Sequence, residues 1–170
     1  RAAAAGAAAE EEWNQLFAKY GEEYKAEHDD LLRRLRGDLP EGWEKNLPTY
    51  TPNDPAVASR KLSEIVLNKI FDAVPELMGG SADLTGSNLT RWKGAVDFQP
   101  PSTGLGNYAG RYIRFGVREH GMGAILNGMA AYGTILPYGG TFLNFVSYAA
   151  GAVRLSALSQ VRVIWAATHD

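Results

Sequence analysis

A strand-like segment followed directly by a helix-like segment constrains the fold of this chain most strongly. Residues 111–115 contain Tyr, Ile and Phe, which favour a pleated surface. Ile125, Leu126 and Met129 then recur at helical spacing. Glu119 lies between the two segments, and open α/β sheets bind ligands at such junctions, beyond the carboxyl ends of their strands. The pattern therefore predicts an α/β sheet with Glu119 at its ligand-binding edge.

Glu119 is the one carboxylate within residues 116–130, which are otherwise mostly small and apolar. A poorly solvated carboxyl group can exchange a proton with a heterocycle at neutral pH. The alternative is a glutamate that the helix dipole stabilises at a helix N-terminus. The spacing alone leaves both interpretations open.

Helix-like and strand-like segments alternate along the rest of the chain. Helices are expected at residues 10–36, 59–73, after Glu119 and at 144–158, and strands at 76–79, 111–115 and 161–166. Ser59 is expected to cap a helix, and residues 137–140, Pro-Tyr-Gly-Gly, are expected to form a turn. The alternation predicts a parallel, doubly wound sheet flanked by helices.

Three regions are predicted from composition. Residues 1–36 form a low-complexity and helical segment, 37–58 a linker rich in turn residues, and 59–170 the α/β domain. The alanine-rich first nine residues are expected to be a linker or a frayed helix. The chain stops just after a strand, where a ligand loop should begin, so we interpret it as part of a longer protein.

Charge and composition argue against several classes of function. The net charge is −2, which gives no electrostatic reason to expect binding to nucleic acid or to an anionic membrane. The absence of cysteine excludes disulfides, thiolate metal sites and cysteine catalysis, and three scattered histidines do not suggest a zinc site. No apolar run reaches the length of a membrane span.

Five motifs in sequence order carry a family resemblance. They are GGSADLT at 79–85, REHGMG at 118–123, PYGGTF at 137–142, FVSY at 145–148 and ATHD at 167–170. Together they resemble the transketolases, specifically the start of their middle, pyrimidine-binding domain. The resemblance extends over nearly the whole chain, from Trp13 onward. Five motifs in register are far more specific than any single glycine-rich match.

The resemblance implies a cofactor, thiamine diphosphate, and a role for each residue near it. The family's matching glutamate, here Glu119, hydrogen-bonds N1′ of the pyrimidine and so helps to remove the thiazolium C2 proton. The other implied contacts are stacking by Phe145, pocket walls from Phe142 and Tyr148, an apolar contact from Val117, and Asp83 near the thiazolium. By pattern alone, the three aromatics would be core residues and Asp83 a turn or cap residue.

The resemblance also implies a substrate site for sugar phosphates. Arg60 and Ser87 match positions that grip the phosphate, and His169 matches a histidine that contacts substrate. An arginine suits phosphate because its planar fork donates two parallel hydrogen bonds. Without the resemblance, Arg60 and His169 would carry no functional interpretation.

Part of the family's site has no counterpart in the sequence. A Gly-Asp-Gly segment with a downstream Asn, which in the family belongs to a first domain that holds the diphosphate with Mg²⁺ or Ca²⁺, is absent. No metal ligand is therefore expected in this chain. The family's site lies between subunits, which implies a homodimer, and the isolated chain is expected to be inactive.

The expected activity is transfer of a two-carbon ketol unit from a ketose phosphate to an aldose phosphate. Three alternatives stay open: a dihydroxyacetone synthase, another thiamine enzyme such as 1-deoxyxylulose-5-phosphate synthase, and a non-catalytic dimerisation module of the same fold. The expected location is the cytoplasm, with the plastid stroma as the alternative.

Overall fold

The computed structural model describes residues 2–169, and the chain divides into two compact units with the boundary between Asp38 and Leu39. The first unit contains two helices, α1 (Ala2–Glu23) and α2 (Lys25–Leu35). The ring of Phe17 on α1 lies 4.6 Å from that of His28 on α2. The alanine-rich start belongs to α1 from Ala2 onward, as a helix rather than a linker, and alanine has the highest helix propensity.

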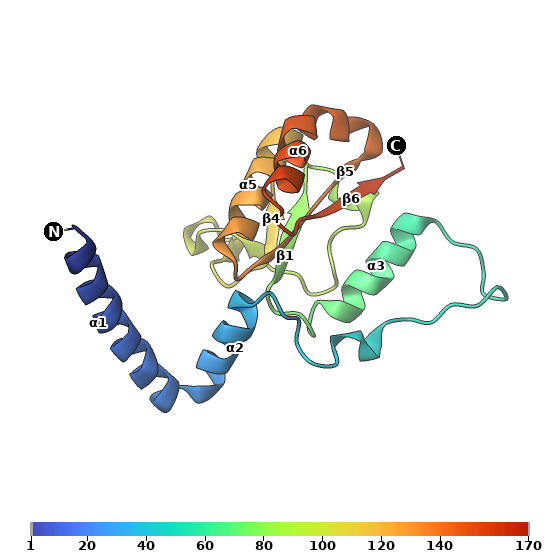
Figure 1. Cartoon of the computed structure of the whole chain (residues 1–170). Helices are drawn as coiled ribbons and strands as arrows, with labels where there is room; N and C mark the ends of the chain where they lie inside the picture. Colours follow the sequence, from blue (N-terminus) through green and yellow to red (C-terminus); the bar gives the residue numbers. More distant parts are fainter. Residues whose placement is uncertain (1, 170) are drawn as a thin grey trace. The chain divides into compact units, whose positions relative to one another are not determined.

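The second unit is built on a six-stranded parallel sheet (Figure 1). Its spatial order is β3-β2-β4-β1-β5-β6. The strands are β1 (Leu77–Ser81), β2 (Asp97–Phe98), β3 (Gly106–Asn107), β4 (Tyr112–Arg114), β5 (Leu136–Phe142) and β6 (Ile164–Thr168). The predicted parallel sheet is confirmed.

Helices cover both faces of this sheet (Figure 1). The main helices are α3 (Ser59–Ile70) on one face, and α5 (Glu119–Tyr132) and α6 (Ala150–Leu158) on the other. Short elements complete the unit: η1 (Trp43–Asn46), α4 (Thr85–Asn88), η2 (Pro101–Thr103) and η3 (Leu143–Ala149). Helices on both faces of a parallel sheet define the doubly wound architecture.

Each face of the sheet has its own core cluster. On the α3 face the buried residues are Phe71, Val74, Leu77, Trp92, Tyr112 and Tyr138, and the partly buried Leu39 and Trp43 pack against them. On the α5 face they are Ala82, Phe115, Met122 and Leu126. Burying apolar surface on both faces leaves the edge of the sheet for polar groups.

Three expectations for local structure were wrong. Residues 137–140 are not a turn but the middle of strand β5. Ser59 is the first residue of α3, and Ala58 occupies the cap position without a side-chain hydrogen bond. The segment expected as one helix at 144–158 is a 3₁₀ segment, η3, followed by α6.

Candidate functional site

The carboxyl ends of four adjacent strands, β4, β1, β5 and the edge strand β6, lie side by side and carry most of the predicted site residues. Strand register pairs Ser81 of β1 with Arg114 of β4 and Gly140 of β5, and Phe142 of β5 with Thr168 of β6. The loops that follow these strands therefore leave the same edge of the sheet. This is the edge at which open α/β sheets bind ligands.

Glu119 begins helix α5 at this edge. Its side chain is buried, with 7% of the residue exposed, and the preceding Arg118 has a non-helical backbone. Thr141 Oγ1 donates a long hydrogen bond, 3.5 Å, to Glu119 Oε1. Within residues 2–169 the carboxyl group has no other hydrogen bond and no ion pair with Lys or Arg. A buried polar group without a strong partner calls for an explanation, and a bound ligand is one.

An aromatic row, Phe142, Phe145 and Tyr148, begins directly after Thr141. Phe142 ends β5, and the other two lie in η3. Adjacent ring centroids are 5.9 Å apart in both pairs. A 3₁₀ helix has three residues per turn, so Phe145 and Tyr148 lie one above the other and their rings stack, while the ring of Phe142 is tilted. Tyr148 is 68% exposed, so the row presents an open aromatic surface.

Asp83 and Val117 lie in the loops after β1 and β4. Asp83 is exposed and has φ +62°, a left-handed conformation that aspartate tolerates better than most residues. Val117 is 77% exposed, although it is apolar. Both therefore lie at the carboxyl edge of the sheet, and neither is a core residue.

The three predicted substrate residues fall into two places. Arg60, in the first turn of α3, donates from Nη1 to the backbone oxygen of Ser87 in α4, at 3.4 Å. His169 follows β6 directly and is exposed. The structure thus joins Arg60 and Ser87, which are 27 residues apart in sequence. Asp170, which completes the ATHD motif, lies outside the described residues.

A buried carboxylate missed by the sequence analysis joins the segment before β2 to β4. Asp97 of β2 accepts hydrogen bonds from Arg91 Nη1 at 2.6 Å and from Arg114 Nε. The bond with Asp97 is the main cause that raises the pKa of the Arg114 guanidinium. The two ion pairs, Arg91–Asp97 and Arg114–Asp97, hold the long segment before β4 against that strand. One acidic residue in a loop-rich stretch gave no sequence signal for this role.

Comparison with known families decides the assignment. Residues 55–170 match the family described as the transketolase pyrimidine-binding domain. This chain belongs to the transketolase family. The resemblance read from five motifs is therefore confirmed, and family membership implies binding of thiamine diphosphate.

Known transketolases align with nearly all of the chain. The enzyme of Kluyveromyces lactis is 68% identical over 166 residues, 97% of this chain and 24% of its own length. A chloroplastic transketolase of Solanum tuberosum is 50% identical over 97% of this chain and 22% of its own. The chain thus spans about a quarter of the length of these relatives.

The fold agrees with a solved transketolase structure. That of the Pichia stipitis enzyme in complex with sedoheptulose-7-phosphate has a TM-score of 0.90 and 65% identity. It covers 98% of this chain and 25% of its own. The parallel sheet and its two helical layers are therefore those of the transketolase family.

The carboxyl edge fits the pyrimidine ring of thiamine diphosphate. Glu119 offers a buried carboxyl group with unused hydrogen-bonding capacity, which suits a ring nitrogen. The aromatic row starts one residue after Thr141, the contact of Glu119, and offers a surface on which a flat ring can stack. No group of three or more His, Asp or Glu residues suited to a metal ion occurs within residues 2–169.

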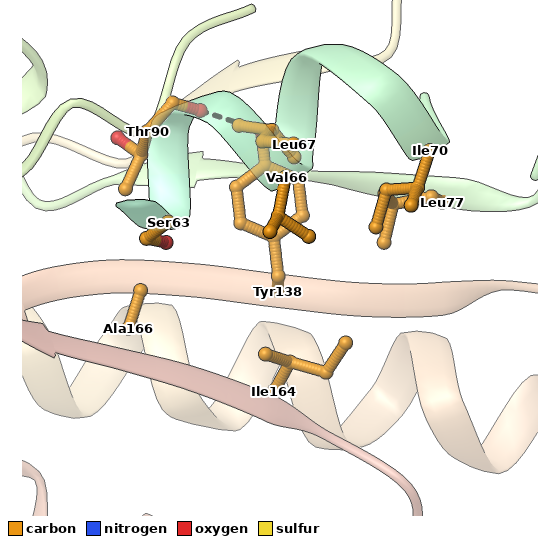
Figure 2. A pocket seen from close by; sticks show the side chains of 9 residues that line it. All are labelled: Ser63, Val66, Leu67, Ile70, Leu77, Thr90, Tyr138, Ile164 and Ala166. Atoms are coloured by element: carbon orange, nitrogen blue, oxygen red, sulfur yellow. Dashed lines mark hydrogen bonds between the residues drawn. The ribbon is translucent and has the colours of Figure 1, made fainter. Parts of the chain in front are cut away.

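A separate apolar pocket of about 250 Å³ lies between α3 and strands β1, β5 and β6 (Figure 2). Its lining residues are Ser63, Val66, Leu67, Ile70, Leu77, Thr90, Tyr138, Ile164 and Ala166. Tyr138 donates its hydroxyl hydrogen to Thr90 O at 2.8 Å, and burial raises the pKa of Tyr138.

Among the helices of residues 2–169, none is both long and apolar enough for a membrane span.

Proposed function

We propose that this chain forms the pyrimidine-binding half of a ketol-transfer site in a longer transketolase. The observation that carries the proposal is Glu119, a buried carboxyl group at a helix start, with one weak hydrogen bond within residues 2–169 and an aromatic row beside its partner Thr141. A positioned carboxyl group of this kind can hold or move a proton on a heterocycle.

Each residue near the cofactor has a separate role in this proposal. Glu119 hydrogen-bonds N1′ of the pyrimidine and holds the proton there. The aromatic row stacks on and encloses the ring, chiefly through Phe145, and Val117 adds an apolar contact. Asp83 lies near the thiazolium. When bound, thiamine diphosphate supplies the reactive carbon that accepts the two-carbon unit, and the protein orients it.

The proposed reaction moves two carbons between sugar phosphates. The bond between C2 and C3 of a ketose phosphate breaks, the shortened sugar leaves as an aldose phosphate, and the two-carbon unit joins the aldehyde carbon of the acceptor. Arg60 and Ser87, joined by a hydrogen bond, bind the phosphate, and His169 contacts the sugar. A guanidinium and a hydroxyl group suit a phosphate, because both donate hydrogen bonds to its oxygens.

The remaining parts of the site come from elsewhere in the protein. We assign the diphosphate and its Mg²⁺ or Ca²⁺ to a separate first domain, and the complete site to a homodimer. The exposed apolar residues Val117, Leu143 and Tyr148 support a covered interface at this edge. For the compartment we propose the cytoplasm, with the plastid stroma as the alternative because the potato relative is named chloroplastic.

The test is a two-substrate assay of the full-length protein. With thiamine diphosphate and Mg²⁺, it should convert xylulose 5-phosphate and ribose 5-phosphate into a seven-carbon ketose phosphate and a three-carbon aldose phosphate. Omission of either substrate or of the cofactor should abolish the products. A full-length protein that binds the cofactor but yields no seven-carbon product would refute the proposed activity.

A further inference from the structure

A buried polar triad, Ser81, Asn88 and Thr168, joins three elements at the carboxyl edge. Ser81 Oγ donates to Asn88 Oδ1 at 2.8 Å, and Asn88 Nδ2 donates to Thr168 Oγ1 at 2.6 Å. All three side chains are buried, and Asn88 is 0% exposed. The Asn88–Thr168 bond joins residues 80 positions apart in sequence. The triad therefore connects the end of β1, helix α4 and the end of β6.

The members of this triad are sequence neighbours of the proposed substrate residues. Ser87 directly precedes Asn88, and His169 directly follows Thr168. The bond between Asn88 and Thr168 therefore links the chain next to Ser87 with the chain next to His169. The sequence analysis gave Asn88 no role in the site, because a single asparagine in a loop-rich stretch has no distinctive spacing.

Helix α4 depends on such bonds for its position. It has only four residues, too few to be stable alone. Besides Asn88, it is held by Thr85, whose hydroxyl lies 2.6 Å from the hydroxyl of Tyr112, and Ser81 Oγ accepts the N–H of Leu84 at 3.0 Å. Of these contacts, the Asn88–Thr168 bond is the one that reaches β6.

We propose that Asn88 and Thr168 are positioning residues, which set the spacing of Ser87 and His169 and thereby the affinity for phosphorylated sugars without touching them. This inference rests on the proposed function. A buried amide cannot replace a lost partner with water, so removing the Thr168 hydroxyl group leaves Asn88 Nδ2 unpaired and favours a shift of α4. A displacement of about 1 Å in a group that positions the substrate can slow a reaction about a hundredfold.

The experiment replaces Thr168 rather than Asn88, because loss of the fully buried Asn88 could prevent folding. In the full-length protein, Thr168→Val should raise the KM for xylulose 5-phosphate about tenfold or more. It should lower kcat/KM for free xylulose less, because that sugar has no phosphate for Ser87 to hold and loses only its contact with His169. Thr168→Ser keeps the hydroxyl group and should restore the KM for the phosphorylated sugar.

Ser156→Ala is the matched control for general destabilisation. Ser156 is buried and donates to Asn127 Oδ1 at 2.5 Å, between α6 and α5 and outside the three joined elements. It should lower the melting temperature to a similar extent as Thr168→Val, but leave KM unchanged. With an active wild type, an unchanged KM in Thr168→Val, or an equal rise in Ser156→Ala, would overturn the inference. An inactive wild type would instead refute the proposed function.

Discussion

Arg60 and Ser87 show how a site can be assembled from separate pieces of sequence. The arginine lies in the first turn of α3, the serine lies in α4, and a 3.4 Å hydrogen bond joins them. The resemblance implied that both residues grip a phosphate, but periodicity and composition alone gave no reason to pair them. Asn88 was missed altogether, because its importance comes from burial and partners that only the folded chain reveals.

Arg60→Ala should weaken binding of phosphorylated sugars in the full-length protein. Loss of a charge-assisted contact costs about 1.5–3 kcal/mol, so the KM for xylulose 5-phosphate should rise at least about tenfold. Free xylulose should be affected little. Lys61→Ala is the control, because Lys61 is an exposed neighbour that pairs with Glu64 on the same helix. Equal losses for the free and the phosphorylated sugar would mean that Arg60 supports structure instead.

Tyr138 should make the protein sensitive to alkaline pH. Burial raises the pKa of Tyr138 in the folded state, while the unfolded tyrosine ionises near its ordinary value of about 10. Above that pH the unfolded state releases a proton that the folded state retains, so stability falls by about 1.4 kcal/mol per pH unit for this group.

The comparison that isolates this effect is Tyr138→Phe against Tyr132→Phe, because Tyr132 is 75% exposed. The urea concentration at the unfolding midpoint should fall from pH 8 to pH 11 in both proteins. The fall should be smaller for Tyr138→Phe than for the wild type. At pH 8 the same variant should be less stable, since Thr90 O loses its donor. Parallel alkaline curves for all three proteins would contradict the prediction.

Among the elements, β5 shows best where the sequence pattern failed. Gly139 and Gly140 suggested a turn, but both lie in a strand whose two faces are covered closely. A Cβ on Gly139 would meet Leu126 at 2.6 Å, and one on Gly140 would meet Thr90 at 2.5 Å. Tight packing, rather than a bend, explains the glycines. Helix α5 was predicted well because its apolar spacing is regular, and β2 and β3 were missed because each has only two residues.

Two glycines of α5 should respond in opposite ways to the same substitution. A Cβ on Gly123 would lie 2.5 Å from Trp165 and 2.7 Å from Ala152, whereas nothing lies within 4 Å of one on Gly128. In the full-length protein, Gly123→Ala should cost about 1–3 kcal/mol by overpacking. Gly128→Ala should raise the free energy of unfolding by about 0.4–1 kcal/mol, because alanine restricts the conformations of the unfolded chain. The melting temperatures of the two variants test both expectations. A lower melting temperature for Gly128→Ala would contradict the expected stabilisation.

For the whole molecule, the sequence predicted the fold class because five motifs and the alternation of elements agreed with each other. The sheet order and the register could not be read from the sequence, since they depend on contacts between distant segments. The domain boundaries at 36, 58 and 59 stay predictions. The structure places its own division between Asp38 and Leu39, and Leu39 packs on the core of the second unit.

The 170-residue chain alone should have no ketol-transfer activity and should self-associate. Its carboxyl edge exposes Val117, Leu143 and Tyr148, which in our proposal face a partner chain. Sedimentation at several concentrations should show a rising average mass, and assays with cofactor and both sugar phosphates should give no product. A concentration-independent monomer would argue against the interface, and turnover would show that the chain holds a complete site.

Hydrogen–deuterium exchange at C2 of bound thiamine diphosphate in the full-length protein reports directly on the role of Glu119. Glu119→Gln keeps the shape of the side chain but cannot pass a proton to N1′, so exchange should slow about 10²–10⁴-fold while the cofactor still binds. The control is Glu76→Gln, because Glu76 is equally buried, at 7%, but directly precedes the amino end of β1. It should exchange at the wild-type rate. An unchanged rate in Glu119→Gln, with cofactor bound, would contradict the role of Glu119 on which the account depends.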